Sequence, residues 1–139
     1  MQNLKKYLTD GIKNTVLYKN NTGTSHNGPW KQVYTDTLLD RWHVGDFSSV
    51  EYTISADFDV NNKELIKVLI TATRDTANLV VYARSNTVND IINITATVND
   101  SYVDVVVNPV IDAEVLTNFT GAKVIYTAQY FHTQNPLVV

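Results

Sequence analysis

Apolar and polar residues alternate strictly from position 50 to position 60, and this run constrains the fold more than any other feature of the chain. Successive side chains of a β-strand point to opposite faces, so a period of two predicts a strand with one apolar and one wet face. Such strands occur in antiparallel sheets whose apolar face covers a core. The apolar members are Val50, Tyr52, Ile54, Ala56, Phe58 and Val60, and the polar members are Glu51, Thr53, Ser55, Asp57 and Asp59.

Further strands follow this run at short intervals. Residues 50–60, 65–73 and 79–84 are joined closely enough to predict a three-stranded meander. Later strands are expected at 91–98, 102–107 and 122–131, with a short piece at 111–116. Asn99-Asp100-Ser101 predicts a tight turn, and Pro109, which has no N–H for a ladder, predicts a strand end or an edge.

The N-terminal part of the chain is less regular. Residues 1–18 combine helical spacing with a β-favouring run at their end, which predicts a short helical or irregular arm and then a strand. Residues 20–29 are rich in Asn, Thr, Gly and Ser, and predict a loop. A strand is expected at 30–36, and a structured connection at 38–48.

These patterns together predict an all-β fold. Roughly seven to nine short strands without long helical patterns are typical of an antiparallel β-sandwich, here of jelly-roll or Greek-key-like connectivity. We expect an N-terminal arm and loop at 1–29 and one β-sandwich domain at 30–139, since 139 residues suit a single domain. Alternation selects the expected core residues: Tyr52, Ile54, Phe58, Val68, Ile70, Val80, Tyr82, Ile92, Ile94, Val103, Val105, Val124 and Tyr126.

Composition excludes several classes of partner. The net charge of −3 provides no basic field for nucleic-acid phosphates or an anionic bilayer, and no apolar stretch approaches the length of a membrane span. We therefore expect binding neither to nucleic acid nor to a membrane. Without cysteine, disulfides and thiolate metal sites are impossible. Charged residues make up 18% of the chain, which leaves more surface for contacts with other proteins.

Metal-ligating patterns are incomplete. Asp57, Asp59 and Asn61 begin like a calcium-binding loop, but Asn62 stands where glycine is required and Val68 where a bidentate glutamate is required. The histidines lack the spacing that brings two ring nitrogens to one zinc ion. We predict that the protein binds no metal and needs no cofactor; the alternative is a weak Ca²⁺ site that residues from another strand complete. The histidines are His26, His43 and His132.

Catalytic patterns are equally weak. No G-x-S-x-G motif marks a nucleophile. Asp40, Asp46 and Glu51 lie near Trp42 in sequence and could imitate a glycosidase pair, yet any acidic sandwich offers such pairs. We predict no catalytic residues and no enzymatic activity.

Aromatic residues gather in the N-terminal part of the predicted sandwich. Exposed aromatic rings can stack on sugars or anchor a protein interface, whereas buried rings belong to the core. We expect Trp42 and Phe47 to be buried and Trp30 to lie in an interface, with Pro29 stiffening its approach. Together with groups near both chain ends, the candidate interface residues are Tyr7, Tyr18, Trp30, Tyr34, Leu137 and Val138.

Three segments carry a resemblance to a known family. They are the opening Leu38-Leu39-Asp40-Arg41-Trp42-His43, the strand at 47–54, and the ladder of strands that ends in Lys123-Val124-Ile125-Tyr126. This pattern resembles β-sandwich domains in virion proteins of large tailed phages that infect marine cyanobacteria. The resemblance covers about two thirds of the chain, and departs from the family at 74–78, where a glycine-containing turn is usual.

The resemblance implies a sandwich used in the head, neck, tail or fibres of a virion. The leading hypothesis is a non-enzymatic structural protein that binds other copies of itself and other virion proteins through the arm at 1–29 and the apolar ends. The alternative is a host-surface glycan-binding module of a tail fibre or baseplate, in which Trp30, Trp42 or Tyr34 stacks on a sugar. A hydrolase is the third possibility.

Overall fold

The computed structural model describes residues 23–110 and 121–134. The expectations for Tyr7, Tyr18, Leu137 and Val138, and for a strand at 111–116, lie outside these residues. All regular structure within them is β-strand. The strands are β1 (Gly23–Asn27), β2 (Lys31–Val33), β3 (Thr37–His43), β4 (Phe47–Asp57), β5 (Lys63–Ala72), β6 (Ala77–Asn86), β7 (Ile92–Asn99), β8 (Tyr102–Pro109) and β9 (Ala122–His132).

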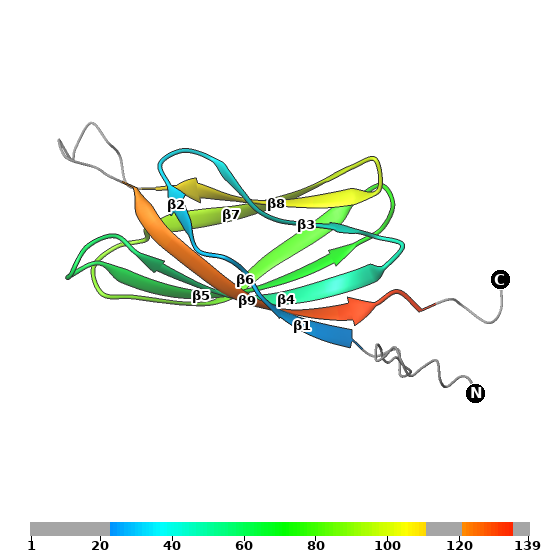
Figure 1. Cartoon of the computed structure of the whole chain (residues 1–139), viewed down its shortest axis with the longest axis horizontal. Coiled ribbons are helices and arrows are strands. Elements are labelled where there is room, and N and C mark those ends of the chain that lie inside the picture. The colour runs from blue at the N-terminus through cyan, green and yellow to red at the C-terminus, as the bar shows by residue number, and fades with distance from the viewer. Residues whose placement is uncertain (1–22, 111–120, 135–139) are drawn as a thin grey trace.

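The strands form two antiparallel sheets that face each other across one core (Figure 1). The larger sheet has the order β1-β9-β4-β5-β6, with β2 also paired to β9, and the smaller sheet has the order β3-β8-β7. The predicted meander is confirmed as β4-β5-β6. After β6 the chain forms β7 and β8 in the smaller sheet, and β9 then returns to lie beside β4 in the larger sheet. The predicted all-β antiparallel sandwich is confirmed.

The alternating run at 50–60 forms most of β4. Its apolar residues point into the core from Val50 to Ala56, as predicted. The strand ends at Asp57, three residues before the predicted end. The Asp59 carboxylate accepts hydrogen bonds from the backbone N–H groups of Asn61 and Asn62, at 2.8 and 2.9 Å, and so turns the chain. Phe58 is consequently half-buried rather than a full core residue.

Two expected core residues of β6 are in fact on the surface, where Val80 is 44% exposed and Tyr82 is 47% exposed. The run 79–82 is apolar at every position, so alternation could not show which residues face inward. The register of β6 shifts opposite Lys67 and Val68, where Tyr82 is an extra residue, and this bulge reverses the alternation. The other expected core residues are buried: Tyr52, Ile54, Val68, Ile70, Ile92, Ile94, Val103, Val105, Val124 and Tyr126.

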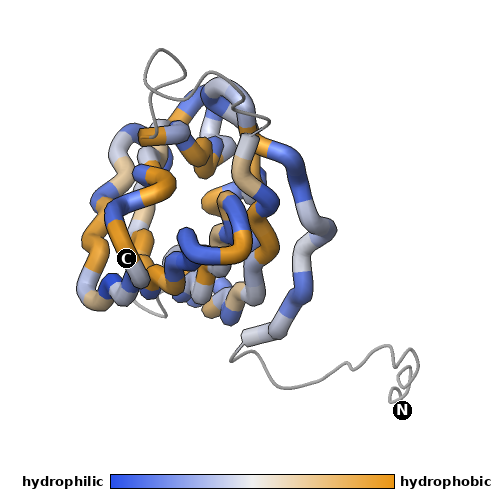
Figure 2. Tube along the Cα trace, turned by 90° about the vertical axis from the view of Figure 1, so that its left-hand side faces the viewer, coloured by the Kyte–Doolittle hydropathy of each residue, from blue (hydrophilic) through white to orange (hydrophobic). Residues whose placement is uncertain are grey.

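The N-terminal predictions need correction. The loop expected at 20–29 contains β1, because Gly23–Asn27 pairs with β9 along the edge of the larger sheet. The strand expected at 30–36 shortens to β2, and the connection expected at 38–48 contains β3. Figure 2 shows the mostly hydrophilic segment of β1 and β2 along one side of the sandwich. Pairing with a distant strand is invisible to local composition.

The tight turn between β7 and β8 is confirmed. Asp100 and Ser101 have φ values of 58° and 67°, and Asn99 pairs directly with Tyr102. Two central residues with positive φ define the hairpin turn whose twist matches that of the flanking strands. Pro109 ends β8, as expected.

Candidate functional site

A groove of about 530 Å³ lies on the face of the larger sheet that points away from the smaller sheet. Thr53 and Ser55 of β4 form part of its floor, and they alternate with the inward-pointing Tyr52 and Ile54. The segment between β1 and β2 forms its wall. The lining residues are Asn27, Gly28, Pro29, Trp30, Thr53, Ser55, Leu65, Ile125, Tyr126 and Thr127.

The floor consists of two rows of side chains that cross the strands. Ser55 pairs with Leu65 of β5 on one side and with Ile125 of β9 on the other. Thr53 pairs with Thr127 of β9. Paired residues of antiparallel strands present neighbouring side chains on the same face. In one row, Leu65 and Ile125 therefore flank the hydroxyl group of Ser55. The neighbouring row presents the hydroxyl groups of Thr53 and Thr127.

The wall exists because β1 and β2 both pair with β9 but are not continuous. Their ladders stop at Asn27 and resume at Lys31. Between them, the N–H of Gly28 donates to the carbonyl oxygen of Tyr126 at 2.9 Å. A Cβ at Gly28 would lie 1.9 Å from Cε1 of the Tyr126 ring, so this close approach requires glycine.

Trp30 is the exposed aromatic residue of the groove. The residue as a whole is 56% exposed. The ammonium group of Lys123 lies 4.6 Å from the centroid of the Trp30 ring. Lys123 does not line the groove. Tyr34 is equally exposed, but it lies beside Gly121 rather than in the groove. Trp30 and Tyr34, both predicted to lie in an interface, are thus found at different places on the surface. Their roles in an interface stay predictions.

The other two aromatic residues belong to the interior. Trp42 is buried, as expected, and its Nε1 donates to the hydroxyl oxygen of Tyr52 at 3.0 Å. This burial excludes Trp42 as a sugar-stacking surface. Phe47 is half-buried against the core, with its ring centroid 4.8 Å from that of Tyr130.

Beneath the groove, Asp40 joins the two sheets. This residue of β3 accepts hydrogen bonds from the hydroxyl groups of Tyr52 and Tyr130, at 2.7 and 2.6 Å, and Tyr126 also bonds to it. Burial, reinforced by the Asp40 charge, raises the pKa of Tyr126 to about 12 and also raises the pKa values of Tyr52 and Tyr130. Tyr126 therefore connects the groove to the core.

The carboxylates considered as a glycosidase pair are not brought together. Asp40 bonds to Tyr52 on the inner face of the larger sheet. Glu51 lies on the opposite face of β4, where it accepts a hydrogen bond from the Tyr82 hydroxyl group. That bond raises the pKa of Tyr82, with smaller contributions from burial and the charge. Asp46 is exposed in the turn between β3 and β4.

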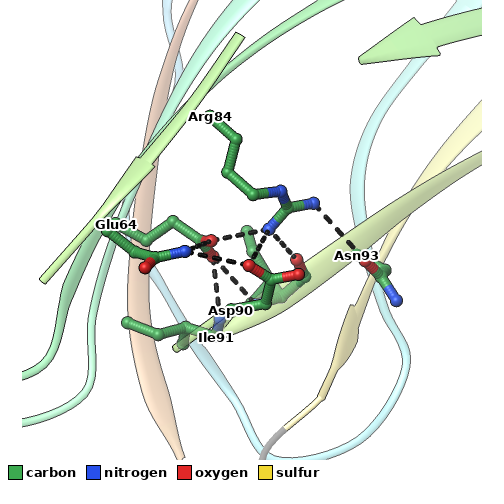
Figure 3. Close-up of polar contacts among 7 residues, drawn as sticks. Glu64, Arg84, Asp90, Ile91 and Asn93 are labelled. Carbon is green, nitrogen blue, oxygen red and sulfur yellow. Dashed lines mark hydrogen bonds and ion pairs between the residues drawn. The ribbon is translucent and has the colours of Figure 1, made fainter. Parts of the chain in front are cut away.

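A second polar cluster closes one side of the sandwich (Figure 3). The buried carboxylate of Glu64 accepts hydrogen bonds from the backbone N–H groups of Ile91 and Ile92, at 2.9 and 3.1 Å. It also pairs with Arg84 at 2.6 Å. Sequence reasoning missed this residue, although Glu64 stands in phase with the inward-facing Ile66, which marks a buried charge that needs partners.

Neither a metal centre nor a membrane-crossing helix is found in the part of the chain that the structure describes. Within residues 23–110 and 121–134, no group of three or more His, Cys, Asp or Glu side chains is placed to hold a metal ion. The same residues contain no helix that is long and apolar enough to span a bilayer. Asp57, from the incomplete calcium pattern, pairs with Lys63 at 3.2 Å.

The fold is similar to part of a phage tailspike. No protein-family model and no curated protein matches the sequence. The tailspike protein of Acinetobacter baumannii phage AM24 aligns with 83% of this chain and 27% of its own, at 11% identity and a TM-score of 0.50. That likeness shows a shared fold.

Two further tailspikes are more distant. That of Acinetobacter phage vB_ApiP_P1 aligns with 89% of this chain and 23% of its own, at 15% identity and a TM-score of 0.40. The tailspike gp49 of Acinetobacter baumannii bacteriophage Fri1, a capsular polysaccharide depolymerase, aligns with 90% of this chain and 21% of its own, at 14% identity and a TM-score of 0.39. The chain spans between 21% and 27% of the length of the three tailspikes.

Proposed function

We propose that the protein is a non-enzymatic component of a phage tail that binds a host-surface glycan in the groove beside Trp30. The exposed indole ring in this groove is the observation that carries the proposal. Aromatic faces pack against the C–H faces of sugar rings, while hydroxyl groups such as those of Thr53 and Ser55 exchange hydrogen bonds with sugar hydroxyls. The groove volume falls within the range of about 300 to 1,000 Å³ typical of small-molecule sites.

The place in a phage tail is supported by the fold that this chain shares with the AM24 tailspike. The proposal does not extend to phages of marine cyanobacteria, which remain a prediction from sequence. Fold alone does not carry function, so the binding role depends on the groove itself.

The absence of catalysis is proposed from the chemistry of the groove. General acid-base catalysis needs an ionisable group within hydrogen-bonding reach of the reacting atoms. All ten lining residues are uncharged, and Tyr126 has its hydroxyl group engaged beneath the groove. We therefore expect a bound polysaccharide to keep its length during prolonged incubation, and progressive shortening would contradict this part of the proposal.

The binding role can be tested with polysaccharide extracted from a susceptible host. Isothermal titration calorimetry should detect binding by the full chain, and Trp30→Ala should abolish it without changing the circular dichroism spectrum. Tyr34→Ala is the matched control, because Tyr34 is as exposed as Trp30 but lies outside the groove. Unchanged binding by Trp30→Ala would overturn the assignment of the site.

A second candidate function is structural docking, which an apolar patch beyond the groove favours. Leu69, Val80 and Tyr82 are exposed on the outward side of β5 and β6. Apolar side chains gathered on a surface often contact another protein. We propose that this patch could bind another copy of the chain or another virion protein, and so reinforce or decorate the particle.

Imaging of the intact particle separates the two functions. Density within the head, neck or tail tube, with the patch of Leu69, Val80 and Tyr82 covered by a neighbour, would favour structural docking. Density at the periphery of the tail, with Trp30 facing outward, would favour glycan binding.

A further inference from the structure

The groove beside Trp30 differs from its surroundings in having no charge and an apolar floor. We infer that it selects an uncharged glycan that carries N-acetyl groups. This inference rests on the proposed glycan binding and adds the class of sugar.

Three lysines that border the groove each have a partner in the structure, although Lys67 is the cross-strand neighbour of the floor residue Thr53. Lys63 pairs with Asp57 at 3.2 Å, Lys67 with Glu51 at 3.9 Å, and Lys123 lies over the Trp30 ring. A sugar carboxylate in the groove would lose water without gaining a cation among the lining residues, which is costly. Acidic sugars are therefore disfavoured relative to uncharged sugars.

The floor combines apolar side chains with hydroxyl groups, and so matches the methyl and amide parts of an acetamido group. Leu65 and Ile125 are both about half exposed, and they flank Ser55 on the adjacent strands. The methyl group of an N-acetyl substituent can cover either apolar side chain. Its amide can exchange hydrogen bonds with the hydroxyl groups of Ser55 or Thr53. A sugar with only hydroxyl groups would instead place some of them against Leu65 and Ile125, where they lose hydrogen bonds to water.

The width of the floor suits a short oligosaccharide. Adjacent strands lie about 4.8 Å apart, so Leu65 on β5 and Ile125 on β9 are separated by about 10 Å. A sugar ring stacked on Trp30, at the β9 side, leaves room for its neighbour to extend across β4 toward Leu65. The glycan chain thus runs across the strands, with one acetamido group near each apolar side chain.

Three trisaccharides test the selectivity on the full chain: chitotriose, which is N-acetylated; cellotriose, which has the same linkage without N-acetyl groups; and trigalacturonate, which is acidic. Titrations followed by tryptophan fluorescence and by NMR chemical shifts should show chitotriose binding at least about tenfold more tightly than cellotriose. Trigalacturonate should not bind. Trp30→Ala should abolish chitotriose binding.

A pair of variants on one strand tests the floor. Leu65→Ser should reduce the preference for chitotriose over cellotriose. Leu69→Ser is the control, because Leu69 is exposed on the same face of β5 but lies outside the groove. An equal loss of preference in both variants would contradict the role of Leu65.

The outcomes separate this inference from the proposed function. Equal affinity for chitotriose and cellotriose, tighter binding of trigalacturonate, or no binding of chitotriose would overturn the inference. The proposed function would still stand if host polysaccharide bound in a manner that depends on Trp30. A dimer that Trp30→Ala dissociates would show that a second copy covers the groove, and would overturn both.

Discussion

Asp40 shows how one side chain can hold two sheets together. Its Oδ2 atom accepts hydrogen bonds from Tyr52 and Tyr130, which belong to the opposite sheet. Tyr52 in turn accepts a hydrogen bond from Trp42. Each of these groups lies in or beside the core, where polar atoms without partners are costly. The cluster therefore specifies how the sheets align as well as how strongly they bind.

Removing one hydroxyl group from this cluster should destabilise the protein. Tyr52→Phe leaves the Trp42 N–H group without its acceptor and deprives Asp40 of one donor. We expect a loss of about 1 to 3 kcal/mol in the free energy of unfolding, measured by urea denaturation. Tyr34→Phe, at an exposed position, is the control and should change this free energy little.

The tyrosine cluster also predicts a loss of stability in alkaline solution. The pKa of Tyr126 rises from 10.0 in the unfolded chain to about 12 in the folded protein, because burial disfavours the phenolate. This raised pKa stabilises the fold fully below pH 10, and the contribution is lost as pH rises through 12. The urea midpoint should fall over this range, and fall less in Tyr126→Phe. A midpoint that both proteins keep constant would contradict the prediction.

At the scale of elements, the β5–β6 hairpin is fastened to β7 through Glu64. Its two carboxylate oxygens accept hydrogen bonds from the backbone at the start of β7 and from Arg84 of β6. The backbone N–H groups of Ile91 and Ile92 are buried there, and both donate to Oε1 of Glu64. The buried charge of Glu64 is therefore neutralised by the charge of Arg84.

Replacing this carboxylate should open the side of the sandwich that it closes. Glu64→Leu leaves Arg84 and two buried N–H groups without their acceptor, so we expect a loss of about 3 to 5 kcal/mol in unfolding free energy. Hydrogen exchange at Ile91 and Ile92 should also accelerate. Asp57→Leu breaks an exposed ion pair with Lys63 and should cost under about 1 kcal/mol. Similar costs for both variants would argue against the closing role.

At the scale of the whole molecule, β1 belongs to the sandwich. It covers one edge of β9, and the His26 ring lies 6.0 and 6.4 Å from the rings of Tyr126 and Tyr130. An uncovered strand edge offers unpaired backbone groups to other chains and promotes aggregation. The boundary at 29 expected from sequence would therefore cut through the larger sheet.

Two truncations test this boundary. A chain that begins at Trp30 should unfold at a lower temperature than a chain that begins at Gly23, and should aggregate, because the edge of β9 is then exposed. Calorimetry and light scattering measure both properties. Equal behaviour of the two truncations would mean that β1 contributes nothing to the sandwich, and would restore the division at 29.

The sequence by itself determined the class of fold and most of the strands. The alternation in β4, the turn residues at Asp100 and Ser101, and Pro109 at the end of β8 each act through local backbone geometry, which neighbouring residues reveal. The burial of Trp42 was also predictable, because a large aromatic residue in a strand-rich region is usually enclosed.

Tertiary structure decided the inward side of β6, the strand at Gly23–Asn27 and the groove itself. The bulge at Tyr82 depends on pairing with β5, and β1 depends on an edge of β9 that is about 100 positions away in sequence. The groove likewise combines Trp30 with residues of β4, β5 and β9. Pairing between distant segments depends on the free energy of the whole fold, and local residue patterns do not encode which strands meet.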